Sequence, residues 1–279
     1  MTLLIGLGAA KAGTSWIHRY LAYHPGCHAP PVKEMHWFDT AYSGWKRRRR
    51  EALWRERTRL SLEGASQARL DRIGRYAALF DGKTLRDRDY LDILSEGSEG
   101  RLRFEITPAY SILPEALIER MARLEKGAAK FFFVMRDPVD RMWSNIRMGA
   151  RRRPGHDMAG RATSLMEEAM RPEGDRHRVR SEYGTILPKL RRAIGADRLL
   201  VLFYEELFRQ DTIDRLCDFA GIERRTAAFD QKVYAGRPLP LDPGLAARAR
   251  LRLDTHYDAV RQMMGRVPDA WMAREEMTR

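Results

Sequence analysis

A glycine-rich segment near the N-terminus carries the residue types that bind an anion. It reads Gly6-Leu7-Gly8-Ala9-Ala10-Lys11-Ala12-Gly13-Thr14-Ser15-Trp16 and joins an apolar run to a stretch of helical periodicity. Glycines allow a close backbone approach, a helix N-terminus offers unpaired N–H groups, and Thr14 and Ser15 add hydroxyl donors. The segment therefore predicts a phosphate or sulfate site.

The position of the lysine separates this segment from the nucleotide triphosphatase loop, which reads Gly-x-x-x-x-Gly-Lys-Ser/Thr. Gly8 and Gly13 have the required separation, but Thr14 stands where that loop has its lysine, and the lysine is at position 11. Its ammonium enters from the strand side of the turn and is placed to reach a bridging oxygen of the bound group. Tight packing alone also accounts for the glycines, but the lysine and the hydroxyls favour an anion site.

A second charged motif follows another apolar run. Residues 131–135 are Phe-Phe-Phe-Val-Met, and Arg136-Asp137-Pro138 opens a helical pattern that contains Ser144. Ligands of open parallel sheets bind at the carboxyl ends of strands, so Arg136 is expected in the same crevice as the first turn. An arginine fork together with a hydroxyl is suited to hold a second phosphate.

Strands that alternate with helices must position these motifs. Apolar runs predict strands at Leu3–Leu7, Leu102–Ile106, Lys130–Met135 and Leu199–Tyr204. Helical periodicity covers Thr14–Tyr23, Pro114–Leu124, Pro138–Met148, Tyr183–Ile194 and Asp211–Ala220. This alternation predicts an α/β fold: a P-loop-like parallel sheet flanked by helices.

The chain has no internal repeat, which favours a single domain over residues 1–279, with basic insertions at about 40–100 and 151–182. Lys46–Arg59 is basic with a helical pattern. Arg151–Arg180 is rich in Arg, Gly and Pro with little periodicity, and Arg151-Arg152-Arg153-Pro154-Gly155 predicts a mobile loop near the substrate. A solvated charged loop without substrate contacts is the alternative for the arginines there.

The two anion motifs resemble those of the sulfotransferases that use 3′-phosphoadenosine 5′-phosphosulfate (PAPS), above all the glycan-modifying branch that includes heparan sulfate sulfotransferases. Lys11-Ala12-Gly13-Thr14-Ser15, followed by Trp16, is similar to the family's 5′-phosphosulfate loop, and Arg136 through Ser144 to its 3′-phosphate motif. Weaker similarities are Lys33-Glu34-Met35-His36-Trp37-Phe38-Asp39, Thr107-Pro108-Ala109-Tyr110, Phe219-Ala220-Gly221-Ile222 and Ala235-Gly236-Arg237-Pro238.

The resemblance implies roles for individual residues. It implies donor binding by the segment from Lys11 to Trp16 and by Arg136, Ser144, Tyr183, Gly236 and Arg237, and substrate contacts by Lys33, Thr107 and Tyr110. Two positions depart from the family pattern. Ala235 replaces a loop lysine, which affects one donor contact, and Ile106 stands where many relatives have a lysine in the substrate cleft.

Sulfuryl transfer moves SO₃ from a phosphosulfate to an acceptor oxygen or nitrogen, so catalysis consists of positioning and charge stabilisation. Lys11 is expected to stabilise the charge on the leaving phosphate oxygen. An acceptor hydroxyl also needs a general base. The resemblance to the family's Lys-Glu-x-His segment implies Glu34 as the first candidate, and His36 is its rival because it resembles the histidine base of other sulfotransferases. A third interpretation has Glu34 only pairing with Lys33 or a nearby arginine. No metal is expected, because cationic side chains supply the charge.

The composition limits the classes of partner that the chain is expected to bind. The 279 residues include 51 Lys and Arg against 38 Asp and Glu, a net charge of +13 that attracts anions. The acceptor is unidentified, and an anionic glycan or a small metabolite suits the charge; nucleic acid is not an expected partner. No apolar run reaches the roughly 20 residues of a membrane span. Two cysteines favour a reducing compartment, and the cytoplasm is the expected location.

The sequence also allows other interpretations of the glycine-rich turn, the net charge and the N-terminal residues. A nucleotide kinase or triphosphatase would use the same turn with Mg²⁺ and ATP, and a non-enzymatic polyanion-binding module would need only the net charge. His24, Cys27 and His28 have a spacing that suits zinc, although Pro25-Gly26 interrupts any helix there. The first twelve residues have an apolar stretch like that of a signal peptide, but they lack its basic start.

Overall fold

The computed structural model describes residues 2–152, 157–173, 175–230 and 238–276. Its centre is a five-stranded parallel sheet in the order β2-β3-β1-β4-β5. The strands are β1 Leu3–Gly6, β2 Cys27–His28, β3 Leu102–Ile106, β4 Lys130–Met135 and β5 Leu199–Phe203. The predicted α/β fold with a parallel sheet is confirmed. The sequence did not predict β2, because two residues are too few to show a pattern.

Helices cover both faces of the sheet, which explains why its strands are apolar throughout. On one face lie α1 (Thr14–Tyr23) and α11 (Gln210–Ala220), joined by the contact of 3.3 Å between the Tyr20 hydroxyl and Cys217 Sγ. On the other face α6 (Glu115–Ala122) packs against α10 (Tyr183–Ile194). The phenylalanines of β4 between these layers are fully buried.

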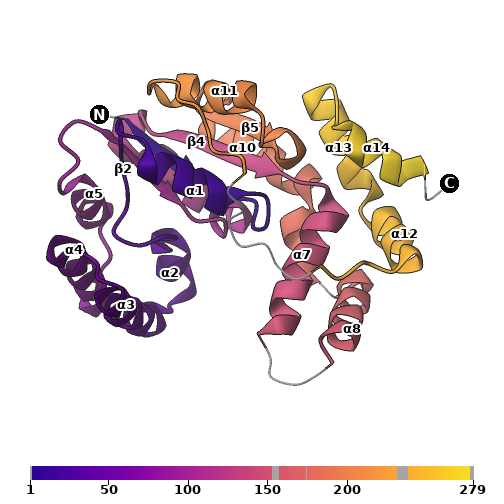
Figure 1. Cartoon of the computed structure of the whole chain (residues 1–279), viewed down its shortest axis with the longest axis horizontal. Coiled ribbons are helices and arrows are strands. Elements are labelled where there is room, and N and C mark those ends of the chain that lie inside the picture. The colour runs from indigo at the N-terminus through magenta and orange to yellow at the C-terminus, as the bar shows by residue number, and fades with distance from the viewer. Residues whose placement is uncertain (1, 153–156, 174, 231–237, 277–279) are drawn as a thin grey trace.

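Further helices lie at the two ends of the sheet (Figure 1). At one end are α2 Trp37–Ser43, α3 Lys46–Leu62, α4 Gln67–Ala78 and α5 Asp87–Ser95. Towards the other are α7 Pro138–Arg151, α8 Met158–Met170, α9 Asp175–Arg178, α12 Pro243–Arg252, α13 Asp254–Met264 and α14 Asp269–Glu276. Short 3₁₀ turns are Leu79–Asp81, Tyr110–Ile112, Leu124–Gly127, Val179–Ser181, Ala196–Arg198 and Tyr204–Glu206.

The sequence shows little periodicity over 151–180, but most of the described part of that interval is helical. Arg151 ends α7, and α8 follows after the Asp157 side chain caps the Gly160 N–H at 2.7 Å. Met166 is buried on α8, and Leu165 and Met170 pack beside it, so an apolar face holds this helix. Residues 153–156 of the predicted loop lie outside the described residues.

Two whole-chain features bear on the sequence predictions. Within the described residues, none of the helices is long and apolar enough to cross a membrane. Cys27 and Cys217 are both buried and carry free thiols.

The sheet brings the two anion motifs together. Beyond the end of β1 the chain continues alongside β4: the Leu7 N–H donates to the Phe132 carbonyl at 2.9 Å, and the Val134 N–H donates to the Gly8 carbonyl at 2.7 Å. The segments that follow these neighbouring parallel strands therefore leave the sheet at the same edge, which is where α/β proteins bind ligands.

Candidate active site

The turn after β1 presents unpaired amides at the start of α1. Gly13 precedes the helix in the left-handed conformation with φ of 80°, and a Cβ on it would lie 2.4 Å from Leu207 Cδ2, so both backbone and space require glycine. The N–H groups of Gly13, Thr14 and Ser15 make no backbone hydrogen bond with any residue that the structure describes. Three donors at a helix N-terminus form a site for an anion.

Lys11 lies in this turn with its ammonium in positive surroundings. Its Nζ is 3.9 Å from Met148 Sδ on α7, and no carboxylate among the described residues pairs with it. Burial lowers the pKa of Lys11, and the neighbouring charges of Arg136, Arg151 and Arg147 lower it further. An anion bound in the turn would relieve this repulsion.

Arg136 follows β4 and reaches the same turn. Its guanidinium donates to the Lys11 carbonyl at 3.2 Å and lies 4.5 Å from the centre of the Tyr204 ring. The Tyr183 hydroxyl donates to the Arg136 carbonyl at 2.9 Å and accepts from its N–H at 3.2 Å. Tyr183 is fully buried, so its role here is to hold the backbone of Arg136.

One face of α7 lines the approach to Lys11. Ser144 and Met148 are four residues apart and share that face, and Arg147 and Arg151 lie three residues after Ser144 and Met148 respectively. Because Met148 touches the lysine, the half-buried Ser144 lies on the side of the helix that faces the turn. Ser144 was a predicted donor-binding residue, whereas Arg147 was not predicted from the sequence.

The segment 33–37 crosses the same region, and we name it the strap. Lys33 Nζ donates to Ser15 Oγ at 2.5 Å and lies 3.8 Å from Glu34 Oε1. The sequence placed Lys33 among the substrate contacts. The structure places its ammonium between the anion-binding turn and the Glu34 carboxylate, where it connects the two.

Glu34, His36 and Asp39 form a hydrogen-bonded row. His36 Nε2 lies 3.4 Å from Glu34 Oε2, and His36 Nδ1 lies 2.6 Å from Asp39 Oδ2. Burial opposes a charge on His36, but the hydrogen bonds to Asp39 and Glu34 outweigh it and raise the pKa of His36 to about 9. At neutral pH this histidine is an imidazolium, which already holds the proton that a general base would accept.

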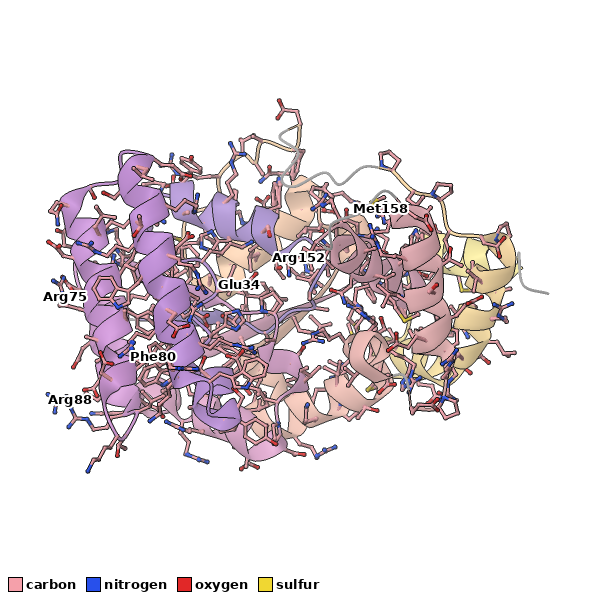
Figure 2. The ribbon with its side chains drawn as sticks, turned by 90° about the horizontal axis from the view of Figure 1, so that it is seen from below. Glu34, Arg75, Phe80, Arg88, Arg152 and Met158 are labelled. Carbon is pink, nitrogen blue, oxygen red and sulfur yellow. The ribbon has the colours of Figure 1, made fainter. Side chains whose placement is uncertain are left out.

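Glu34 behaves in the opposite sense. Burial alone would raise its pKa, but the hydrogen bond from His36 and the charge of Lys33 lower the pKa below its usual value. Glu34 is therefore a carboxylate at neutral pH, with its side chain 36% exposed. Of the two candidate bases, this one has the required protonation state. In Figure 2 Glu34 and Arg152 are labelled near the middle of the molecule, between the α3–α4 pair and the helices α7 and α8.

The three predicted catalytic residues share a rare backbone conformation. Lys11, Glu34 and His36 have φ of 72°, 58° and 54°, in the left-handed region that favours glycine. Such conformations cost on the order of 1–3 kcal/mol each and persist only where the surroundings enforce them. They concentrate at functional sites, which supports a functional role for this part of the chain.

Three side chains from β3 and the turn after it enforce the strap conformation. The Met35 N–H donates to Glu105 Oε1 at 3.0 Å, the His36 N–H to Thr107 Oγ1 at 3.2 Å, and the Trp37 N–H to the Tyr110 hydroxyl at 2.8 Å. Glu105, Thr107 and Tyr110 are all fully buried. The expectation that Thr107 and Tyr110 contact substrate thus needs correction: both side chains lie beneath the strap and support it.

Glu105 was not predicted, because a single glutamate in an apolar strand gives no signal of its partners. Burial raises its pKa to about 7, against the effect of hydrogen bonds from Thr107 and Met35. Its Oε2 has no hydrogen-bond partner among the described residues. The strap therefore rests on a carboxyl group that titrates near neutral pH.

An aromatic group lies beside the anion-binding turn. Trp16 stacks on Tyr20 and on Phe229, with ring centres 5.9 and 5.6 Å apart. A cavity of ≈ 400 Å³ next to it is lined in part by Trp16, Tyr20, Tyr23 and Arg225. The cavity offers space for a flat aromatic base beside these rings.

A larger cavity of ≈ 670 Å³ lies away from this chemistry, at the start of β3. Arg103 and Arg120 line it, but Glu125 and Asp87 already pair with them at 2.9 and 2.6 Å. Its charges are largely neutralised, so the site at the turn is the better candidate.

Two further predictions have different outcomes. Gly236 and Arg237, with Ala235, lie outside the described residues. The zinc spacing at His24 is not supported, because His24 Nδ1 accepts from the Gly26 N–H at 3.0 Å and His24 Nε2 lies 2.9 Å from the Glu223 carbonyl oxygen.

Arg141 is a supporting residue that the sequence alone did not single out. It is fully buried and donates to the Ala10 carbonyl of the turn at 3.4 Å and to Ser181 Oγ and the His177 carbonyl at 2.6 Å. Burial lowers its pKa to about 10. Its guanidinium thus ties α7 to the turn.

Fold and site together define a parallel α/β protein with an anion-binding strand–turn–helix and a carboxylate beside it. A family model described as "Sulfotransferase family" matches residues 4–226, and the chain belongs to that family. No curated protein sequence matches the chain.

Two solved structures share the fold. One is a sulfotransferase from Alicyclobacillus acidocaldarius, with a TM-score of 0.64 and 20% identity over 96% of this chain and 98% of that chain. The other is the sulfotransferase domain of the Synechococcus PCC 7002 olefin synthase, with a TM-score of 0.55, 20% identity and 96% of both chains covered. At this identity the likeness concerns the fold.

Proposed function

We propose that this sulfotransferase moves the sulfuryl group of PAPS to a hydroxyl or amine of an acceptor. The observation that carries the proposal is the meeting of two cationic residues at one sheet edge, Lys11 in the turn after β1 and Arg136 after β4, where the Arg136 guanidinium donates to the Lys11 backbone carbonyl at 3.2 Å. A donor with phosphates at both ends of its ribose needs two such groups.

The donor would be held by groups of this chain. The amides of Gly13, Thr14 and Ser15 suit the 5′-phosphate, and Arg136 with Ser144 suits the 3′-phosphate. The cavity beside Trp16 has room for the adenine. The residues present therefore fit the donor without a metal ion.

The transfer step follows from the charges. The acceptor oxygen forms a bond to sulfur while the bond between sulfur and the bridging phosphate oxygen breaks. Glu34 accepts the proton of the acceptor hydroxyl, and the Lys11 ammonium stabilises the charge that develops on the leaving oxygen. His36, held as an imidazolium by Asp39, orients the Glu34 carboxylate.

The acceptor is proposed to be anionic, either a glycan or a small metabolite. Arg147 and Arg151 on α7 flank the residue that touches Lys11, and together with Lys33 they exceed what the donor's two ends require. A cytoplasmic location stays a prediction.

Turnover measurements test this function. The full chain is incubated with PAPS, EDTA and a panel of neutral and anionic alcohols and amines, and adenosine 3′,5′-bisphosphate (PAP) and sulfated products are quantified by chromatography and mass spectrometry. We expect PAP to form in step with a sulfated product, unaffected by EDTA. Mg²⁺-dependent ADP formation from ATP, with no use of PAPS, would instead support a kinase or triphosphatase.

A further inference from the structure

The C-terminal helices contact the residue that directly follows Arg136. On α13, the Tyr257 hydroxyl donates to Asp137 Oδ2 at 2.8 Å, and both residues are buried. Asp137 directly follows Arg136 in the chain. Both α13 and α14 lie beyond residue 226, so this contact comes from a part of the chain that the family model does not cover.

Asp137 joins three elements. Its N–H donates to Glu205 Oε1 at 2.8 Å, and its Oδ1 accepts from the Asp140 N–H at 2.8 Å, which caps the start of α7. Its Oδ2 accepts from Tyr257. An N-cap of this kind fixes the first turn of a helix, and α7 carries Ser144.

A single buried ring supports both tyrosines that hold this segment. Trp271 on α14 is 1% exposed and packs edge-on against Tyr257, with ring centres 5.6 Å apart. It also stacks on Tyr183 at 6.3 Å, and the Tyr183 hydroxyl binds the backbone of Arg136 on both sides.

Helices α10 and α13 come close enough for this arrangement because of Gly184. A Cβ on Gly184 would lie 2.9 Å from the Ala259 Cβ, a distance that side chains do not tolerate. Because Gly184 has no side chain, α13 can approach α10 closely enough for Tyr257 to reach Asp137.

We propose that Tyr257 and Trp271 are positioning residues for recognition of the donor's 3′-phosphate. They fix the Arg136–Asp137 backbone and the first turn of α7, and with them the two groups, Arg136 and Ser144, that hold this phosphate. The proposal rests on the proposed function. Neither residue contacts the nucleotide, so their influence passes through Asp137 and Tyr183.

The test compares two nucleotides that differ only in the 3′-phosphate. Isothermal titration calorimetry on the full chain gives Kd for PAP and for adenosine 5′-monophosphate (AMP). The ratio of Kd for AMP to Kd for PAP measures recognition of that phosphate, and it falls when this recognition is weakened. For Tyr257→Phe we expect Kd for PAP to rise about tenfold, because a hydrogen bond to a buried carboxylate is lost, while Kd for AMP changes less than about twofold.

Tyr90→Phe is the matched control. Tyr90 is fully buried, and its hydroxyl has no hydrogen-bond partner among the described residues, so its loss should leave both constants unchanged. Trp271→Phe is a second variant, which keeps the Tyr257 hydroxyl but loosens its support; we expect a smaller fall in the same ratio. It provides the same readout if Tyr257→Phe does not fold.

The outcomes are distinct. If Tyr257→Phe weakened the binding of PAP and of AMP equally, the role of Tyr257 would be merely structural and the proposal would be overturned. An unchanged ratio of the two dissociation constants in the folded variants would also overturn it. If the unaltered chain bound PAP no more tightly than AMP, the assignment of the 3′-phosphate site in the proposed function would fail instead.

Discussion

At the scale of single residues, the site is defined by the charge states of Lys11, Glu34 and His36. The Lys11 ammonium touches a methionine sulfur, and burial and nearby cations lower its pKa. Glu34 and His36 face each other as carboxylate and imidazolium. We propose that Lys11 stabilises the leaving group and that Glu34 accepts a proton.

Replacement of Lys11 tests the first role. Lys11→Met keeps the length of the side chain and removes its charge, so we expect kcat to fall about 10²–10³-fold, as for other lost oxyanion-stabilising groups. The exposed Lys83 supplies the control variant Lys83→Met, which should leave kcat unchanged. Normal turnover by Lys11→Met would contradict the role.

The pH profile tests the second role. Because the folded pKa of His36 is raised from 6.5 to about 9, its pairing stabilises the protein fully below pH 6.5, and this contribution is lost as pH rises to about 9. We expect the rate to fall above about pH 9, as Glu34 loses its imidazolium partner, and to hold down to below pH 4.5, since the pKa of Glu34 is lowered.

NMR titration of the His36 ring measures this directly. A midpoint near 6.5 would be inconsistent with the row of hydrogen bonds between Glu34, His36 and Asp39. In His36→Gln the part of the alkaline fall that follows the His36 titration should disappear, because that group has been removed.

At the scale of elements, the strap depends on β3 and the turn after it. Glu105, Thr107 and Tyr110 accept hydrogen bonds from three consecutive N–H groups and so hold Glu34 and His36 in left-handed conformations. The burial of Glu105 opposes its charge. Since its folded pKa is raised from 4.5 to about 7, the folded state binds more protons than the unfolded state in this range, and stability falls as pH rises.

Glu105→Gln tests this dependence. A glutamine oxygen still accepts from the Met35 N–H, but it does not ionise. The unaltered chain should lose unfolding free energy as the pH rises from 4.5 to 7, and the variant should lose less. The difference should be up to about 3 kcal/mol, since a shift of one pKa unit corresponds to about 1.36 kcal/mol. Urea denaturation at several pH values measures it, with the exposed Glu99→Gln as control. An identical pH dependence in Glu105→Gln and the unaltered chain would refute the assignment.

Much of the sheet was predictable because its strands are buried on both faces. Phe131–Met135 and Leu3–Gly6 are continuous apolar runs, and the glycine-rich turn and Arg136 follow them directly. The two anion motifs were therefore placed at one sheet edge from local sequence alone. The two-residue β2 and the helix α8, hidden in an arginine-rich interval, were not predictable in this way.

Contacts between distant segments explain the errors at the site. Thr107 and Tyr110 were expected in the cleft, but their hydroxyls accept from the strap 71 and 73 residues away in sequence. Lys33 reaches Ser15, and its predicted contact with the substrate stays a prediction. No pattern within a short window encodes such pairings, and Glu105 and Tyr257 were missed for the same reason.

At the scale of the whole molecule, the chain has a net charge of +13, which favours the approach of the proposed anionic donor. A positive field raises the rate at which anions reach such a site, by about 10–10³-fold at low salt in steered associations. We expect the association rate constant of PAP to fall as ionic strength rises, with a much smaller change in its dissociation rate constant. Stopped-flow measurements from low to high salt check this, and a salt-independent association rate would contradict it.

The central claim is that Lys11 with its turn and Arg136 hold opposite ends of one bisphosphorylated adenosine. Calorimetric titration of PAP into the full chain in the presence of EDTA tests it most directly. We predict one PAP bound per chain, with the advantage of PAP over AMP largely lost in Arg136→Gln. The claim would be contradicted if the folded chain released no heat with PAP, or if Arg136→Gln bound PAP as tightly as the unaltered chain.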